Sequence, residues 1–599
     1  MTLEIKQNSS ETRLVYDGLG RLWRTIQAAP VPGAVRPTTI QILDNSGRVT
    51  EVQDPQGNRT QFVYDPAGRQ IQSTDAEGSH SMTEYDARGN VTQTIDPLNR
   101  TLVSVYDHAA RRIRKATASV VIDGQLVVPV TRRHFDAAGN VISTTDVLGN
   151  RTDFTYDTMN RVSSRLLPDP DGPGPLGRSL STESYDTAGN RIRSVDAAGR
   201  ATTFVYDSLG RQVRVDLPAL TSSTSEFTLS EFDAFGNLTA FVDALQRRTV
   251  HEYDGLNRKR RTIHPDPDRI GAVNGPLTSP IEEWNYDAVG NVISHRNPRL
   301  ALTTWEYDAL GRRTRTVLSD PDGPSGPLTA PATTVRYDLN GNVIATVDAL
   351  QRTTTMEYDR LNRLRVTRLP ETDTPGGRQV LTLTTIYDAA GRPIQKIDAL
   401  GRVTTYEYDT HDRIVRTLLP DPDGTSGPQS SVPQTTVYDL AGNLVASTDE
   451  LGRTTVHEYD RLNRLVRTTQ PDPDGPGSDS LPAPFELLTY DPVGRVISRS
   501  DTIGRTTLYT YDVRDRIVET QLPTIDINGA VVTVREFRKY DAGGRIIEDT
   551  DRMNRKTFYH YNNQDQLLRT IRPAPDGTVG TAASPDIRQT WDSAGNLLT

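Results

Sequence analysis

Four copies of the tetrapeptide Asp-Pro-Asp-Gly are the segments most suggestive of metal binding. They run from Asp169 to Gly172, from Asp320 to Gly323, from Asp421 to Gly424 and from Asp472 to Gly475. A calcium loop of the EF-hand type needs a bidentate Glu at its twelfth position. Counted from the first Asp of each copy, that position holds Leu180, Pro331, Val432 and Ala483. We therefore interpret these segments as turns and predict no metal site.

A second set of carboxylates recurs at a fixed place, usually with Arg four residues later. Its members are Asp96, Asp146, Asp196, Asp243, Asp348, Asp398, Asp449, Asp501 and Asp551. A catalytic pair of carboxylates needs two environments that differ from each other, and nine equivalent copies argue against that. An Asp and an Arg across a turn can instead form charge-assisted hydrogen bonds. We predict a structural role.

Other catalytic signatures are missing from the sequence. The chain has no Cys, and its nine His residues show no metal-ligand spacing. Phosphate-binding and serine-hydrolase motifs are likewise absent. His251 and His457 stand at a position that elsewhere holds an aromatic residue, so we interpret them as substitutes for Phe or Tyr. We predict no enzymatic activity and no cofactor for this chain.

All of these residues belong to a repeat that begins with an aromatic residue and Asp and continues into a short turn. There are 24 starts between Tyr16 and Trp591, and 20 of them use one of the 23 tyrosines. The other starts are Leu43, Phe135, Phe232 and Trp591, and Asn562 replaces Asp once. Representative structural residues are Tyr64, Asp65, Gly68 and Arg69; Tyr206, Asp207, Gly210 and Arg211; and Tyr307, Asp308, Gly311 and Arg312.

The spacing of the starts shows a second period. Short links of 21 residues alternate with links of 26 to 33 residues, so the repeat is a pair of units of about 50 residues. The sixth motif residue follows this alternation. Asn precedes short links at 90, 140, 190, 237, 291, 342 and 443, and Arg precedes long links at 111, 161, 211, 258, 312, 363 and 464. Arg392, Arg495 and Arg545 break the rule.

Each unit is predicted to form two strands and two turns. Segments such as 91–95 and 101–106 are rich in Val, Ile, Thr and aromatic residues and are bounded by Gly, Asp, Asn and Pro, which is typical of strands. No segment shows helical periodicity. The long links add Pro-rich loops such as 167–175, which cannot continue a sheet. The sequence therefore predicts an all-β array of tandem antiparallel hairpins.

Side chains two residues before the motif Tyr form an aromatic ladder on one face of the predicted sheet. This ladder contains Phe62, Phe154, Phe204, Trp305, Tyr406, Tyr509 and Tyr559. Residues one before the Tyr point the other way and include Glu252, Glu306, Glu357, Glu407 and Glu458. We interpret the aromatic face as packing. Stacked rings that bind sugars, or a wall that holds an unfolded polypeptide, are alternatives.

The recurring Tyr-Asp-x-x-Gly-Arg/Asn motif with its 21-residue links resembles the YD repeat of the RHS family, from about Tyr16 to Thr599. That family includes bacterial polymorphic toxins, the cocoon-forming subunits of insecticidal toxin complexes, and teneurins. The resemblance implies a spiralling antiparallel sheet that forms part of a hollow shell or an open solenoid. Asp65-Pro66-Ala67-Gly68 and Asp491-Pro492-Val493-Gly494 resemble the family's Asp-Pro-x-Gly elements, but they lie inside ordinary repeats, so we assign them no protease role.

Composition excludes several other classes. The net charge of −9 argues against a nucleic-acid binder. No apolar run is long enough to span a membrane, and no signal peptide is visible at the N-terminus. The resemblance alone suggests a secreted or cell-surface location. About 39% of the chain is apolar when Gly is counted and Tyr is not, below the roughly 45–50% of globular domains.

These observations predict a lead-in over residues 1–15 and one repeat array over 16–599 that stops inside a unit, as in a piece of a larger protein. The leading hypothesis is a non-catalytic shell that encloses a C-terminal toxin or effector domain absent from this sequence. The alternative is a surface protein that mediates adhesion or binds glycans through the aromatic ladder.

Overall fold

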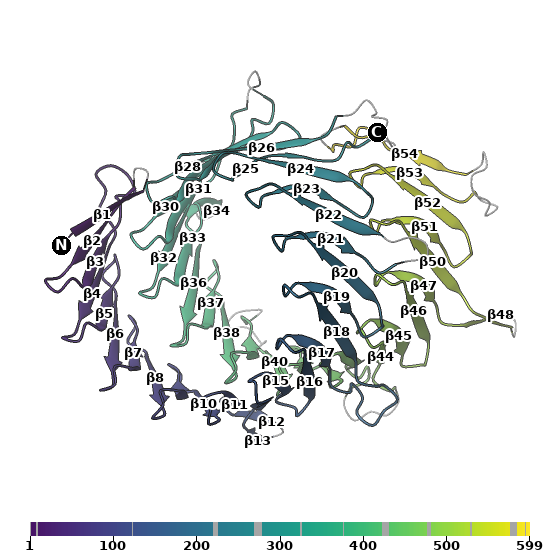
Figure 1. Ribbon diagram of the computed structural model, residues 1–599, viewed down its shortest axis with the longest axis horizontal. Coiled ribbons are helices and arrows are strands. Elements are labelled where there is room, and N and C mark those ends of the chain that lie inside the picture. Colours follow the sequence, from purple (N-terminus) through teal and green to yellow (C-terminus); the bar gives the residue numbers. More distant parts are fainter. Residues whose placement is uncertain are drawn as a thin grey trace. The chain divides into compact units, whose positions relative to one another are not determined.

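The computed structural model describes residues 2–7, 10–122, 124–219, 226–268, 278–323, 326, 328–374, 377–421, 431–475, 481–527, 530–574, 584–592 and 595–599. In these ranges all regular structure is β-strand, in 54 strands that Figure 1 shows as successive arrows joined by turns and loops. Within the same ranges, no helix is long and apolar enough to cross a membrane. The predicted all-β class of antiparallel hairpins is confirmed.

The chain divides into two compact units, each built from two long stretches and one short connecting segment. Unit 1 contains Met1–Arg133, Asn285–His295 and Ala301–Arg453. Unit 2 contains His134–Trp284, Arg296–Leu300 and Thr454–Thr599. We call the long stretches of each unit its first and second stretch, in chain order.

The strands of unit 1 fall in its two stretches. Those of the first stretch are β1 (Thr2–Gln7), β2 (Ser10–Tyr16), β3 (Leu22–Ile26), β4 (Thr38–Leu43), β5 (Val49–Gln53), β6 (Arg59–Tyr64), β7 (Gln70–Thr74), β8 (His80–Tyr85), β9 (Val91–Ile95), β10 (Thr101–Tyr106), β11 (Arg112–Ala116), β12 (Val120–Ile122) and β13 (Gln125–Val127). Those of the second stretch are β28 (Leu302–Tyr307), β29 (Arg313–Val317), β30 (Ala332–Tyr337), β31 (Val343–Val347), β32 (Thr353–Tyr358), β33 (Leu364–Arg368), β34 (Thr372–Thr374), β35 (Gly377–Gln379), β36 (Thr382–Tyr387), β37 (Pro393–Ile397), β38 (Val403–Tyr408), β39 (Ile414–Leu418), β40 (Pro433–Tyr438) and β41 (Leu444–Thr448).

The strands of unit 2 are arranged in the same way. Those of the first stretch are β15 (Val141–Thr145), β16 (Arg151–Tyr156), β17 (Val162–Leu166), β18 (Leu180–Tyr185), β19 (Arg191–Val195), β20 (Ala201–Tyr206), β21 (Gln212–Asp216), β22 (Phe227–Phe232), β23 (Leu238–Val242), β24 (Arg248–Tyr253) and β25 (Lys259–Ile263). Those of the second stretch are β42 (Thr454–Tyr459), β43 (Leu465–Thr469), β44 (Phe485–Tyr490), β45 (Val496–Asp501), β46 (Thr506–Tyr511), β47 (Ile517–Gln521), β48 (Ile525–Ile527), β49 (Ala530–Val532), β50 (Arg535–Tyr540), β51 (Ile546–Thr550), β52 (Lys556–Tyr561), β53 (Leu567–Ile571) and β54 (Asp586–Arg588). Unit boundaries fall within β14 (Val130–Phe135), β26 (Ile281–Tyr286) and β27 (Val292–Arg296).

Each hairpin turns at the six-residue motif, which we call the tyrosine turn. In β8 and β9, Glu84 pairs with Gln93 but Tyr85 pairs with Val91, so the register shifts by one residue at the Tyr. The fifth motif residue, Gly89, has φ of 88°, a backbone conformation that glycine adopts without strain. This shift is a β-bulge, and a turn that ends in a left-handed residue is a common way to close a hairpin.

The opposite ends of the strands are joined in two ways. Short links carry a five-residue turn, such as 96–100 between β9 and β10, which we call a mid-unit turn. Long links carry loops, and three of these loops contain a small hairpin of their own, made by β12 and β13, β34 and β35, and β48 and β49. The Pro-rich loop 167–175 contains no strand, as predicted.

Few side chains are buried. Among the described residues, the buried apolar ones are Ala28, Ala116, Val120, Ala240, Val242, Ala345 and Ala574. Strands such as β6 alternate between exposed and half-buried residues. A sheet of this kind has little core, so hydrogen bonds, ring stacking and ion pairs at the turns must supply much of its order.

Candidate functional site: the repeated turns and the pocket at Trp305

The Asp of each tyrosine turn closes the turn with its own side chain. In the turn at 206–211, Oδ1 of Asp207 accepts from the backbone N–H of Leu209 at 2.9 Å and of Arg211 at 3.0 Å. Its Oδ2 accepts from Nε of Arg211 at 2.7 Å. Asp suits this position because its carboxylate reaches the backbone two residues ahead.

The Arg at the sixth position links one tyrosine turn to the next. Nη1 of Arg69 donates to the carbonyl oxygen of Asp86 at 2.9 Å, and its guanidinium lies 4.7 Å from the centre of the Tyr85 ring. Tyr85 in turn donates its hydroxyl hydrogen to the carbonyl oxygen of Gln70 at 2.9 Å. A stacked cation contributes about 0.5–1 kcal/mol at exposed sites. The motif therefore links consecutive tyrosine turns along one edge of the hairpins.

The other residues predicted to form the motif occupy equivalent places. Arg211 donates to the carbonyl oxygen of Asp233 at 2.8 Å, and Arg312 donates to that of Asp338 at 3.1 Å. The hydroxyls of Tyr64, Tyr206 and Tyr307 donate to carbonyl oxygens of the preceding hairpin at 2.8 to 3.0 Å. The fifth residues Gly68, Gly210 and Gly311 have φ of 83°, 74° and 73°.

Hydrogen bonds to the ionised form shift the acidity of the turn carboxylates. The backbone N–H of Arg69 and then its side chain lower the pKa of Asp65. For Asp207, the side chain of Arg211 and then its backbone N–H lower the pKa. Such carboxylates stay charged at neutral pH and serve as hydrogen-bond acceptors in the turns.

Asn at the sixth position connects to the next turn through its shorter side chain, which carries an amide and no guanidinium. Asn342 donates to the side-chain oxygen of Asn362, the fifth residue of the next turn, at 2.7 Å. The pairs Asn140 with Asn160 and Asn237 with Asn257 repeat this bond at 2.8 and 2.9 Å. Arg is not restricted to long links, because Arg48 and Arg69 also precede 21-residue links and still reach the next turn.

Of the five arginines that precede 21-residue links, Arg392, Arg495 and Arg545 share a further feature that the sequence pattern did not reveal. The fifth residue of the next turn is Asp412, Asp515 and Asp565, respectively, and these are the three tyrosine turns of the sequence with Asp there. The Arg-to-Asp distances are 3.0, 2.9 and 3.0 Å. Each Asp therefore replaces the Asn or Gly of an ordinary turn and forms an ion pair with the preceding unit.

Each of these aspartates also binds an arginine from the other stretch of its own unit. In unit 1, Nη1 of Arg100 lies 2.5 Å from Oδ1 of Asp412. In unit 2, Arg200 lies 2.6 Å from Asp515 and Arg247 lies 2.7 Å from Asp565. We call these three contacts the clamps. They join a mid-unit turn of the first stretch to a tyrosine turn of the second.

Burial and charge distinguish the clamp arginines. Their side chains are 17%, 13% and 15% exposed at Arg100, Arg200 and Arg247. Partial burial disfavours the charged form, yet the carboxylates of Asp412 and Asp96 outweigh it and raise the pKa of Arg100. Arg100 also donates to the carbonyl oxygen of Thr410 at 3.2 Å. The clamps are thus partly desolvated and charge-assisted, which strengthens a hydrogen bond.

The mid-unit carboxylates lie where the sequence predicts, and most bind the Arg four residues later. Nε of Arg100, Arg200 and Arg247 donates to Asp96, Asp196 and Asp243 at 2.6 to 2.7 Å. In the 146–150 turn, Asn150 takes the place of Arg. Among the described residues, no group of three or more His, Asp or Glu side chains is arranged to hold a metal ion. Most of the third Asp-Pro-Asp-Gly segment, 422–424, lies outside the described residues.

The seven residues of the aromatic ladder are all half-buried. Their neighbours one position before the motif Tyr, including Glu306 and Glu407, are exposed. Nδ1 of His251, which stands at a ladder position, lies 3.0 Å from the hydroxyl oxygen of Thr262. Burial, followed by the charge of Lys259, lowers the pKa of His251. The alternation of the two faces agrees with the strand register, and the role of the ladder stays a prediction.

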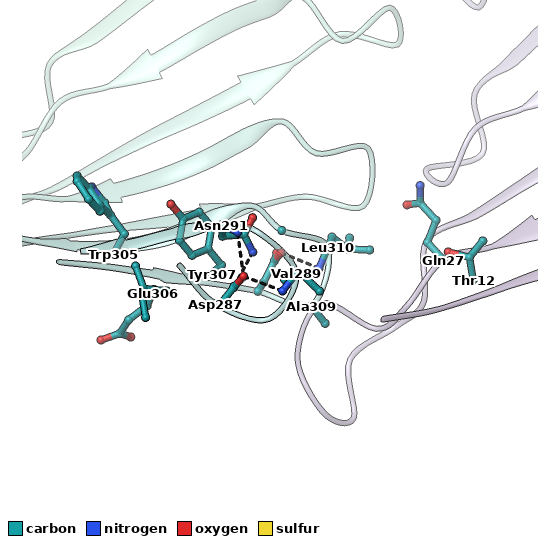
Figure 2. A pocket seen from close by; sticks show the side chains of 13 residues that line it. Thr12, Gln27, Asp287, Val289, Asn291, Trp305, Glu306, Tyr307, Ala309 and Leu310 are labelled. Atoms are coloured by element: carbon teal, nitrogen blue, oxygen red, sulfur yellow. Dashed lines mark hydrogen bonds between the residues drawn. The ribbon is translucent and has the colours of Figure 1, made fainter. Parts of the chain in front are cut away.

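One ladder residue lines a pocket of about 640 Å³ in unit 1, which Figure 2 shows from close by. Trp305 and Tyr307 belong to β28, and Gln27 and Thr12 of the first stretch lie at the other end of the pocket, across from Leu310 and Ala309. The carboxylate of Asp287 is engaged in its own turn, since it accepts from the backbone of Val289 and from Asn291. The pocket therefore offers rings and amides more than free charge.

The hairpins and their turns define a class of protein, a tandem β-hairpin repeat whose turns are linked by Tyr, Asp and Arg. A family model described as RHS repeat matches residues 44–80, 135–171, 185–221, 286–325, 337–379, 387–426, 438–474 and 490–524. These segments cover just over half of the chain. The chain belongs to the RHS-repeat family.

Solved structures share this fold at low sequence identity. A crystal structure of TcdB2–TccC3–TEV has 14% identity and a TM-score of 0.59, over 96% of this chain and 35% of that one. TcdB2–TccC3 without its hypervariable C-terminal region has 14% identity and a TM-score of 0.59, over 98% and 36%. The Photorhabdus luminescens Tc holotoxin pore has 14% identity and a TM-score of 0.57, over 98% and 35%. The chain thus spans about a third of the length of these structures. No curated protein sequence matches it.

Proposed function

We propose that this chain is the scaffold wall of a larger RHS protein that encloses a C-terminal toxin or effector domain lying outside this sequence. The observation that carries the proposal is the likeness to TcdB2–TccC3 without its hypervariable C-terminal region, which matches 98% of the chain. The matched part is therefore distinct from that variable region. The same likeness supports the further proposal that the protein acts outside a bacterial cell or at its surface.

The site chemistry supports a scaffold without catalysis. Charged side chains of the tyrosine turns are engaged in their own turns, as Asp207 and Arg211 illustrate. They also recur along the chain in equivalent environments, whereas acid–base catalysis needs groups with different proton affinities. The contacts of Tyr, Asp and Arg link consecutive hairpins and are therefore suited to stabilising a wall.

Proteinase protection tests this proposal. A protease-sensitive polypeptide attached after Thr599 should be degraded much more slowly than the same polypeptide free in solution, because the wall limits access. A control fusion carries the polypeptide on a long flexible linker before Met1. Digestion of the C-terminal fusion at the rate of the free polypeptide would overturn the proposal.

A second candidate function is glycan binding, which the pocket at Trp305 favours. Ring faces combined with amide groups suit sugars, and Trp305, Tyr307 and Gln27 supply both kinds of group. Binding on a glycan array should fall when Trp305→Ala is introduced and stay unchanged in Phe204→Ala, a matched ladder residue. A blank array for the unmodified chain would contradict this function.

A further inference from the structure

The mid-unit turns of the second stretches carry the same arginine as the clamped turns. In unit 1 these are Arg352, Arg402 and Arg453, and in unit 2 they are Arg505 and Arg555. Each donates through Nε to the Asp four residues earlier, at 2.6 to 2.8 Å. The same internal bond holds the clamp arginines, so all eight side chains are fixed at the Nε end in the same way.

Exposure separates the two groups. The five arginines of the second stretches are 59%, 59%, 60%, 65% and 46% exposed in chain order. The three clamp arginines are 13% to 17% exposed. The unclamped group therefore presents positive charge to solvent in a side chain that its own turn already orders.

Apolar side chains accompany these arginines. The third residue of each unclamped turn is Leu350, Leu400, Leu451, Ile503 or Met553, and these are 68% to 75% exposed. In a docked turn of unit 2, the equivalent Leu245 is half-buried and lies against Gly543, where an added Cβ would lie 2.5 Å from its Cδ1. An undocked mid-unit turn therefore exposes both an apolar side chain and an ordered Arg.

A second copy of the chain does not supply the matching charge. Strand β10 connects the clamped mid-unit turn 96–100 to the tyrosine turn at 106–111. Strand β38 connects the mid-unit turn 398–402 to the clamped tyrosine turn at 408–413. We call two such strands, joined by a clamp, a column. The outer ends of the column are Arg402 and the tyrosine turn 107–111, whose fifth residue is Ala110. In the clamp columns of unit 2, Arg505 and Arg555 correspond to Gly210 and Asn257. None of the three fifth residues carries a carboxylate.

We propose that the mid-unit turns at 501–505 and 551–555 of unit 2 form a docking edge for another RHS-repeat segment whose tyrosine turns carry Asp at the fifth position. The clamps of unit 2 already show this pairing of Arg with Asp, and the exposed Arg505 and Arg555 offer the complementary charge. The edge selects its partner by charge, because ordinary turns with Gly, Ala or Asn offer no carboxylate to the outer guanidinium nitrogen. This inference holds whether or not the wall encloses a guest.

An engineered copy of the chain is the probe. The donor carries Gly210→Asp and Asn257→Asp, together with Arg505→Glu and Arg555→Glu to block its own edge. Asp already occupies the same left-handed position at 412, 515 and 565, with φ of 63° to 64°. Mixed with the unmodified chain, the donor should form a complex in sedimentation velocity that weakens as the salt concentration rises.

Two matched controls isolate the charge. A donor with Asn in place of the two new Asp residues should bind about tenfold more weakly or worse. An acceptor with Arg505→Gln and Arg555→Gln should not bind the donor. The proposal is overturned if the donor and the unmodified chain sediment separately, or if both controls associate as well as the donor does.

A simpler donor guards against misfolding of the variant with four substitutions. Asn257→Asp alone is isosteric and keeps a residue that already has φ of 59°. Its binding to the unmodified chain should be weaker than that of the full donor and should disappear with Arg555→Gln in the acceptor. Binding that ignores Arg555 would count against the edge.

Discussion

Two joints in the second stretch of unit 1 use the same backbone with different side chains. At one, Asn342 donates to Asn362 at 2.7 Å, and at the other Arg392 binds Asp412 at 3.0 Å. The first joint connects neighbouring turns of one stretch. The second does so too, but its carboxylate also binds Arg100 from the other stretch. Charge at the fifth position therefore serves the contact between stretches, and the hairpin closes without it.

Acid should have the largest effect, because it protonates the carboxylates that close the turns at both kinds of joint. Hydrogen bonds lower the pKa of turn carboxylates such as Asp65 from the usual 3.8. The stabilisation that they provide is complete above that value and is lost as the pH falls through the lowered pKa of the folded state. We expect cooperative loss of the β-sheet circular dichroism signal below about pH 4. A sheet signal unchanged at about pH 2 would contradict this.

Removal of all three clamps should have the next largest effect. Asp412→Asn, Asp515→Asn and Asp565→Asn together should lower the free energy of unfolding by about 3–6 kcal/mol, because charge-assisted bonds contribute about 1.5–3 kcal/mol each and these are partly exposed. Urea unfolding at low and high salt measures it. The loss should shrink at high salt.

The matched control for the clamps removes the neutral joints. Asn160→Ala, Asn257→Ala and Asn362→Ala delete hydrogen bonds between uncharged side chains. Their cost should not depend on salt, since screening acts on charges. Equal salt dependence in the two variants would remove the distinction between the joints.

Loss of one clamp arginine should lower the free energy of unfolding more than loss of an exposed, unclamped arginine. Arg100→Gln should cost about 1–3 kcal/mol, because it leaves Asp412 without one of its two cations. Arg402→Gln, in a turn of the same stretch as Asp412, should stay within about 0.5 kcal/mol. Hydrogen exchange of the backbone amides at 96–100 and 409–413 should accelerate only in Arg100→Gln.

The smallest effect is the creation of a new clamp. Ser79 holds the position of the clamp arginine in a mid-unit turn that already contacts the turn of Asn362, since Glu77 accepts from the backbone N–H of Arg360 at 3.0 Å. Ser79→Arg with Asn362→Asp should show a favourable coupling of about 0.5–1 kcal/mol in a double-mutant cycle. No coupling would mean that the native clamps need more than these two residues.

Local patterns predicted most of the fold. The alternation of Val, Thr and aromatic residues predicts strands, and Asp and Gly at fixed positions predict the turns, because both depend on neighbours within a few residues. The structure confirms the hairpins from β2 to β53 on this basis. The small hairpins in three long loops were not predicted, since segments such as 120–127 do not belong to the repeat.

The clamps could not be placed from the sequence, because their partners are separated by more than 300 residues. In the sequence, Asp412 is one of many turn residues, and only the structure shows that Arg100 lies beside it. A signal was nevertheless present. Arg392, Arg495 and Arg545 depart from the Asn rule, and each is followed by the rare Asp at the fifth position. Arg48 and Arg69 also depart from the rule but are followed by Gly68 and Gly89, so the rare Asp, and not the Arg alone, marked the residues with a role outside the repeat.

The spacing of the clamps has an evolutionary consequence. Partners are 312, 315 and 318 residues apart. Repeat arrays commonly gain and lose units by duplication and deletion. Here a change of one pair of units, about 50 residues, between Arg100 and Asp412 would bring a different tyrosine turn opposite Arg100. The clamps therefore fix the number of units between their two partners, since a gain or loss there would break the ion pair. Units outside the clamped segments can vary in number without this cost.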